Sequence, residues 1–156
     1  MGSGLKGGCG CGAVRYRLVS APIFVQCCHC NDCRRQSGGA FVINGLIETD
    51  RIEVLAGQLT HYTMPTESGR PHDLHRCNIC NTTLWSDYGR REVLSFLRIA
   101  TLDEPNALPP NAHIFTRSKL PWIELMGAPE FDVYYDMTTL WPAESLARRR
   151  ALLGDV

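Results

Sequence analysis

Cysteines carry most of the chemistry that this sequence could perform. Four of its eight cysteines stand in one short stretch, QCCHCNDCRR, which runs from Gln26 to Arg35. Three of these, Cys28, Cys30 and Cys33, have the pattern C-x-C-x-x-C, which suits three ligands on one metal ion. A zinc ion with three protein ligands and one open position is typical of a catalytic site. The stretch therefore predicts a catalytic zinc centre.

The neighbours of these cysteines are expected to point elsewhere. In an extended segment, alternate side chains face opposite sides, so Cys27 and His29 would face away from Cys28 and Cys30. Cys27 would then be an unliganded thiol packed in the core.

The charge of the centre indicates what its open position would accept. Zinc with three thiolates has a net negative charge, so it activates water poorly compared with a zinc held by neutral imidazoles. It is soft, however, and would accept another sulfur. Arg34 and Arg35 could offset the charge and hold the carboxylate of an anionic thiol. A solvated surface pair is the alternative interpretation of these arginines.

The second group of cysteines combines two distant pairs. Cys9 and Cys11 form a C-x-C pair among glycines, and Cys77 and Cys80 form a C-x-x-C turn. Four thiolates complete a tetrahedral zinc site, which is typical of a structural metal that joins parts of the chain. Four unrelated buried thiols are the alternative.

Composition limits the classes of protein. The 156 residues are 44% hydrophobic and carry 16 basic and 16 acidic side chains, which predicts a globular domain without a basic nucleic-acid surface. No apolar run is long enough to span a membrane. The N-terminus lacks an apolar signal core, so we expect a cytoplasmic protein whose reduced thiols bind metal rather than form disulfides.

Short apolar segments separated by Gly and Pro predict a mainly β fold with one or two short helices. We expect a hairpin from residues 52–55 and 59–63, and a strand over 41–47 with a bulge at Gly45. Residues 14–18 and 82–86 are further predicted strands, and 92–100, apolar on both faces, is the predicted central strand. Residues 102–111 are a predicted loop.

The C-terminal end has a different pattern. Apolar residues at helical spacing after Pro142 predict a short helix that Gly154 ends. Arg148, Arg149 and Arg150 would form its solvated face. Elsewhere, the tryptophans at 85, 122 and 141 are predicted to lie in the core or a pocket wall, and His113 to be a hydrogen-bonded core histidine. Residues 66–69 form either a ligand-binding loop or a plain turn.

Five segments together resemble the glutathione-dependent formaldehyde-activating enzyme family, which also includes centromere protein V. They are GCGCGAVRY, CHCNDCRRQSGGAF, TESGRP, RCNIC and AHIFTRSKLPW. The resemblance covers about residues 8–121, leaving an extension over about 122–156 in one expected domain, 1–156. Asn81 stands where the family usually has Gly, and Asn tolerates the left-handed conformation. Cys27 is a second departure.

The resemblance implies a β-tent fold with two zinc ions per chain. The structural zinc would be held by Cys9, Cys11, Cys77 and Cys80, and the catalytic zinc by Cys28, Cys30 and Cys33. His29 could be a further ligand or a hydrogen-bond donor behind the ligands, and we expect the donor because all family ligands are thiolates.

The implied activity is that of a carbon–sulfur lyase, in which formaldehyde condenses with glutathione to S-hydroxymethylglutathione. Its partners would be a small thiol, such as glutathione, and a small aldehyde. The alternatives are a non-catalytic zinc module that binds a thiol or a protein, and a disulfide-rich structural protein.

Overall fold

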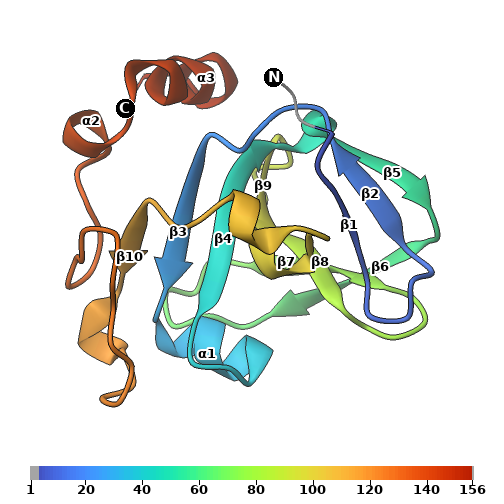
Figure 1. Ribbon diagram of the computed structural model, residues 1–156, viewed down its shortest axis with the longest axis horizontal. Helices are drawn as coiled ribbons and strands as arrows, with labels where there is room; N and C mark the ends of the chain where they lie inside the picture. Colours follow the sequence, from blue (N-terminus) through green and yellow to red (C-terminus); the bar gives the residue numbers. More distant parts are fainter. Residues whose placement is uncertain (1–3, 156) are drawn as a thin grey trace.

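The computed structural model describes residues 4–155 and has the predicted mainly β architecture. Within these residues, ten strands form two sheets, of order β10-β3-β4-β9-β8-β7-β6 and β1-β2-β5 (Figure 1). Residues 1–3 belong to the N-terminal stretch that lacks an apolar signal core, and they lie outside the described residues.

The strands and helices have the following bounds. The larger sheet contains β3 Phe24–Cys28, β4 Val42–Glu48, β6 Leu59–Met64, β7 His72–Cys77, β8 Thr83–Tyr88, β9 Leu94–Arg98 and β10 Ala112–Ile114. The smaller contains β1 Lys6–Gly8, β2 Arg15–Leu18 and β5 Ile52–Ala56. The α-helices are α1 Asn31–Ser37, α2 Met137–Leu140 and α3 Ala143–Leu153, and 3-10 turns cover Thr49–Arg51, Ile99–Thr101, Pro105–Ala107 and Thr116–Ser118. Helix α1 was not predicted.

The predicted central strand is confirmed, because β9 is the fourth of the seven strands. The predicted hairpin is wrong. Strand β5 pairs with β2, whereas β6 pairs with β7 in the other sheet. Gly57 between them has a φ of 84°, and a Cβ there would lie 2.4 Å from the carbonyl oxygen of Ala13. This close approach turns the chain from one sheet into the other.

The bulge predicted at Gly45 is also wrong. The pairing of β3 with β4 continues without a register shift from Phe24 with Leu46 to Cys28 with Val42. Gly45 instead makes room for a neighbour, since a Cβ there would lie 2.7 Å from the Cδ1 of Ile99. The glycine therefore marks the close approach of another segment rather than a bulge.

The strands divide the interior into two cores. Alternate residues of β3 point to opposite sides, so Val25 belongs to one core and Phe24 and Cys28 to the other. The core shared by the two sheets contains Cys9 and Cys77. The other lies between the larger sheet and the C-terminal segment, and Tyr135 and Trp141 join it.

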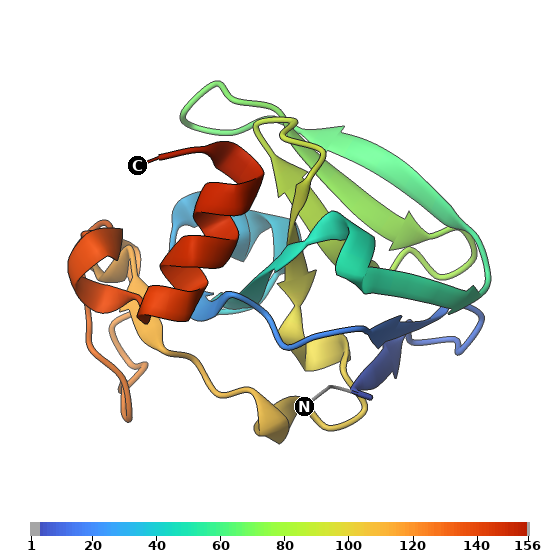
Figure 2. The same ribbon diagram turned by 90° about the horizontal axis from the view of Figure 1, so that it is seen from above.

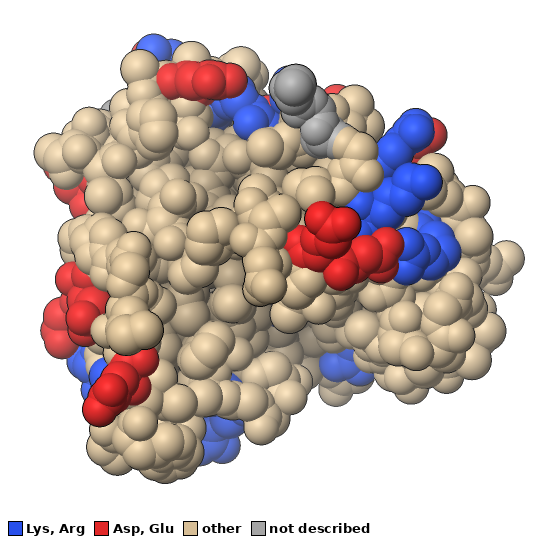
Figure 3. All heavy atoms as spheres, in the orientation of Figure 1, with Lys and Arg blue, Asp and Glu red and all other residues tan. Residues whose placement is uncertain are grey.

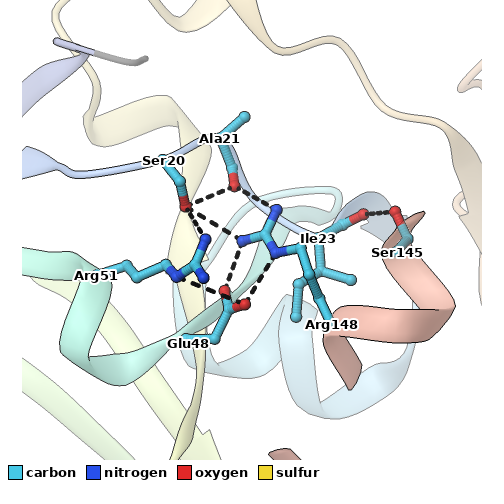
Figure 4. A network of polar contacts seen from close by, with 7 residues as sticks. All are labelled: Ser20, Ala21, Ile23, Glu48, Arg51, Ser145 and Arg148. Atoms are coloured by element: carbon cyan, nitrogen blue, oxygen red, sulfur yellow. Dashed lines mark hydrogen bonds and ion pairs between the residues drawn. The ribbon is translucent and has the colours of Figure 1, made fainter. Parts of the chain in front are cut away.

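Helix α3 packs on the β3 and β10 side, away from the smaller sheet (Figures 1 and 2). Its predicted end is confirmed, because the N–H of Gly154 donates to the carbonyl of Arg150. Arg148, predicted to be solvated, instead forms an ion pair with the buried Glu48 at 2.5 Å. It also donates to the carbonyl of Ala21, as Figure 4 shows. This network attaches the helix to β4.

Other surface features are simpler. Trp122 is 70% exposed, so its predicted place in the core is wrong, whereas Trp85 and Trp141 are buried. Acidic and basic side chains lie near one another on the face in Figure 3. Within residues 4–155, no helix has both the length and the apolar character needed to cross a membrane.

Candidate metal centres and active site

Strand β3 and helix α1 position the cluster Cys28, Cys30 and Cys33, which we call the open cluster. Cys28 ends β3, Cys30 caps α1, and Cys33 lies in its first turn. The three sulfur atoms lie within 4.8 Å of one another. The N–H of Cys33 donates to the Cys30 sulfur at 3.3 Å. The local chain thus brings three donors together at the start of a helix, where negative charge is favoured.

All three cysteines line a cavity of about 380 Å³. The sheet and the core beside it supply largely apolar walls, including Leu46, Leu94, Phe96 and Ile114. The C-terminal segment supplies another wall, made of Tyr134, Met137, Trp141 and Arg149. Ser68, from the predicted ligand-binding loop, also reaches the cavity. The open cluster therefore faces a space large enough for a small organic ligand.

Without a cation, the open cluster concentrates negative charge on one sulfur. Hydrogen bonds from Cys28 and Cys33 lower the pKa of Cys30 to about 2. The contact with Cys30 raises the pKa of Cys28 far above its usual range. At Cys33 the hydrogen bond with Cys28 is outweighed by Cys30 and by burial, and the pKa rises to about 12. Three thiolates therefore require a cation, so this donor set fits a zinc ion.

A buried arginine that the sequence analysis missed lies beside the open cluster. Arg98, on β9, is 8% exposed and donates to the side-chain oxygens of Asn44 and Gln36. Burial lowers its pKa, while the charges of Cys33, Cys28 and Cys30 oppose that shift. Its signal in the sequence was a charged residue inside the apolar run 92–100, where burial demands a partner.

Arg98 begins a directed chain of hydrogen bonds. Because Arg98 donates to Gln36 Oε1, the amide nitrogen of Gln36 faces His72 Nδ1 at 3.3 Å. His72 Nδ1 must then accept, and its Nε2–H donates to Ser86 Oγ at 2.8 Å. Burial, and then the charge of Arg98, lower the pKa of His72 to about 4, which keeps the ring neutral. The Ser86 hydroxyl lines the cavity and keeps its own hydrogen to donate.

The two arginines predicted to bind substrate do not line the cavity. Arg34 donates to Asn31 on its own helix, and Arg35 follows it on α1. Their role in substrate binding stays a prediction. Two other half-buried arginines, Arg91 and Arg149, do line the cavity, and neither forms an ion pair within residues 4–155. Burial raises the pKa of Tyr134, while the charges of both these arginines lower it.

The other four cysteines form the closed cluster: Cys9, Cys11, Cys77 and Cys80. Their sulfurs are 3.5 Å apart between Cys9 and Cys11, and 3.8 Å between Cys11 and Cys77. A tetrahedral zinc with bonds of about 2.3 Å separates its sulfurs by about 3.8 Å, so this cluster also fits the metal.

Backbone groups hold the closed cluster in place. The N–H of Val14 donates to the Cys9 sulfur at 3.2 Å, and that of Ile79 to the Cys77 sulfur at 3.4 Å. Asn81 has a φ of 61°, the left-handed conformation predicted for the residue that replaces glycine. None of the four cysteines lines the cavity.

A model of the glutathione-dependent formaldehyde-activating enzyme family matches residues 4–118. The chain belongs to this family. It is 30% identical over 155 residues to a Halomonas elongata protein named "Putative glutathione-dependent formaldehyde-activating enzyme", and the alignment covers 96% of each chain. A crystal structure of a Rhodobacter sphaeroides protein is similar with a TM-score of 0.48 and 20% identity, covering 80% of this chain and 98% of that one.

The family match places both cysteine clusters within its bounds and leaves the C-terminal wall of the cavity outside them. All eight cysteines precede residue 81, whereas Tyr134, Trp141 and Arg149 lie after residue 118. The family match therefore includes both donor sets, while this part of the cavity wall lies beyond its bounds.

Proposed function

We propose that this protein is a carbon–sulfur lyase of the S-(hydroxymethyl)glutathione synthase type, which adds glutathione or a similar small thiol to formaldehyde or a related aldehyde. The observation that carries the proposal is the open cluster on the cavity wall. Family membership supports glutathione and formaldehyde as the reactants.

Cys28, Cys30 and Cys33 would hold a catalytic zinc, and Cys9, Cys11, Cys77 and Cys80 a structural one. A zinc ion bound by the open cluster would lower the pKa of an incoming thiol, as it lowers that of water. The positive charge of Arg98 would offset the negative charge of three thiolates. This role was predicted for Arg34 and Arg35.

The chain's own polar groups would orient the aldehyde. The thiolate sulfur attacks the carbonyl carbon, a C–S bond forms, and the π electrons move to the carbonyl oxygen. The Ser86 hydroxyl, held by His72, donates a hydrogen bond to that oxygen as its negative charge develops. The thiol releases its proton to solvent, and solvent protonates the resulting alkoxide oxygen, so the product is a hemithioacetal.

Arg91 and Arg149 would bind the carboxylates of the thiol. Both arginines line the cavity and have no acidic partner among the described residues, so a carboxylate would meet no competing ion pair. Holding the thiol in this position would raise the rate, because the reacting atoms are kept close together.

The test is the rate of condensation of glutathione with isotope-labelled formaldehyde, followed by NMR against the uncatalysed background. We expect the purified protein to exceed the background, the chelated protein to lose the excess, and Ser86→Ala to lower kcat about 100-fold with KM little changed. A wild-type rate equal to the background would contradict the proposal and favour a binding module.

A further inference from the structure

A third group of metal-ligand residues lies on the opposite face of β3. None of Cys27, His29 and His113 lines the cavity, and the predicted alternation places Cys27 and His29 opposite Cys28 and Cys30. Strand β10 runs parallel to β3 with His113 opposite Cys27. The three side chains are 2%, 0% and 6% exposed, and their nearest ligand atoms all lie within 4.8 Å of one another.

The distances within this group suit a metal better than hydrogen bonds. His29 Nε2 lies 3.4 Å from His113 Nδ1, which is long for a hydrogen bond between nitrogen atoms. It lies 3.5 Å from the Cys27 sulfur. A tetrahedral zinc with bonds of about 2.0–2.1 Å to nitrogen and about 2.3 Å to sulfur gives separations of about 3.3 and 3.6 Å.

Long contacts within the group leave each of the two rings paired at one nitrogen only. The outer nitrogens, His29 Nδ1 and His113 Nε2, are buried without a partner in the described residues. Buried histidines are normally fixed by hydrogen bonds, so the predicted burial of His113 is confirmed, whereas its predicted full hydrogen bonding is not. Both rings instead turn one nitrogen toward the same point beside the Cys27 sulfur, which a shared cation explains.

We propose that Cys27, His29 and His113 form a third metal site, for zinc or another divalent late-transition ion. One thiolate and two imidazoles are ligands that zinc and copper accept, whereas calcium and magnesium require oxygen. The two zinc ions expected from the sequence leave this group unassigned. Cys27, the thiol that departs from the family pattern, is its only anionic ligand.

The site would attach an edge strand whose other face forms part of the cavity. Strand β10 has three residues, and β3 is its only neighbouring strand in the larger sheet among the described residues. Ile114, next to His113, lines the cavity together with Phe115. A metal shared by the two strands would therefore fix this wall from behind, without contact with the substrate.

Metal content of the folded full chain tests the site. After dialysis, mass spectrometry should find three zinc ions per wild-type chain, and two in His113→Gln and in Cys27→Ala. His75→Gln, a change at a partly buried histidine outside the group, should keep three. One copper in place of the third zinc, lost in the same variants, would also support the site. Two metals in the wild type, or three in His113→Gln, would overturn it.

Titration with Co²⁺ covers the case in which a variant fails to fold. The wild-type chain should take up a third equivalent whose absorption has the weaker charge-transfer band of a single thiolate. Saturation at two equivalents would overturn the proposal. Neither readout depends on turnover, so the third site and the proposed enzymatic function fail independently.

Discussion

The closed and the open clusters use the same donor atom in different surroundings. The closed cluster joins residues 9–11 to 77–80 and lies apart from the cavity, with Cys9 and Cys77 in the core that the two sheets share and Cys11 and Cys80 exposed. The open cluster is assembled within six residues and faces the cavity beside Arg98. The difference teaches that the proposed division between a structural and a catalytic metal rests on the surroundings of the thiols rather than on ligand type.

The largest effect is expected from breaking the closed cluster. Cys77→Ser removes a fully buried ligand that joins distant parts of the chain. Structural zinc contributes about 10 kcal/mol or more in small zinc domains, which is comparable to the whole stability of about 5–15 kcal/mol. We expect the variant to be unfolded at room temperature by circular dichroism. A folded variant with a wild-type Tm would contradict the structural role.

Cys30→Ser tests whether the open cluster is needed for activity but not for folding. Cys30 is partly exposed, and its neighbours β3 and α1 are held by backbone hydrogen bonds. We expect one metal fewer, a rate reduced at least about 100-fold, and a Tm within a few degrees of wild type. If this variant unfolds as Cys77→Ser does, the two clusters do not differ in role.

Removing the attachment of α3 should lower stability and disturb the cavity wall opposite the open cluster, without touching the closed cluster. Arg148→Ala leaves the buried Glu48 carboxylate without its closest cation, and Arg51 lies 3.6 Å away. Breaking such a pair costs about 3 kcal/mol. We expect lower stability in urea and a higher KM, because the helix carries Arg149 and follows Trp141. Unchanged KM in a destabilised protein would show that the wall does not contact substrate.

A smaller effect is expected from the cavity arginines. Arg91→Ala and Arg149→Ala should each raise the KM for glutathione about 10-fold, since each removes a charge-assisted contact, with kcat nearly constant. Arg150→Ala is the matched control, because Arg150 is exposed on the same helix and pairs with Asp155. An equal change in Arg34→Ala would instead support the role predicted for the arginines of α1.

The smallest effect concerns pH. The pKa of His72 is lowered to about 4 by burial and then by Arg98, so the ring stays neutral through the ordinary titration range of histidine. The kcat profile should therefore show no inflection near pH 6.5 from this residue. An inflection there that His72→Gln abolishes would mean that His72 carries a proton in the reaction. In that case the directed chain to Ser86 would be wrong.

The sequence predicted what depends on short-range pattern. It identified both cysteine clusters, the central strand, the C-terminal helix and the opposed directions of Cys27 and Cys28, because spacing and alternation determine these features. Strand pairing depends on contacts between distant segments. The approach of Gly57 to Ala13, which separates β5 from β6, leaves no trace in the local pattern.

Charged residues were predicted least well, for the same reason. In the sequence, Arg148 stands between other arginines and alanine, which is typical of a solvated helix face. Only the folded chain brings Glu48 to it. Arg91 precedes β9 and Arg149 lies on the last helix, so their meeting at one cavity is a property of the tertiary structure, as is the place of Arg98 beside the open cluster.

The late position of the cavity wall has an evolutionary consequence. Tyr134, Met137, Trp141 and Arg149 line the cavity proposed to receive the thiol, and the segment after residue 118 contains no cysteine and lies beyond the family match. We therefore expect mutations in this tail to alter selectivity while every thiol is preserved. A lineage could diversify the molecules it accepts by exchanging this segment, with the inherited metal chemistry left intact.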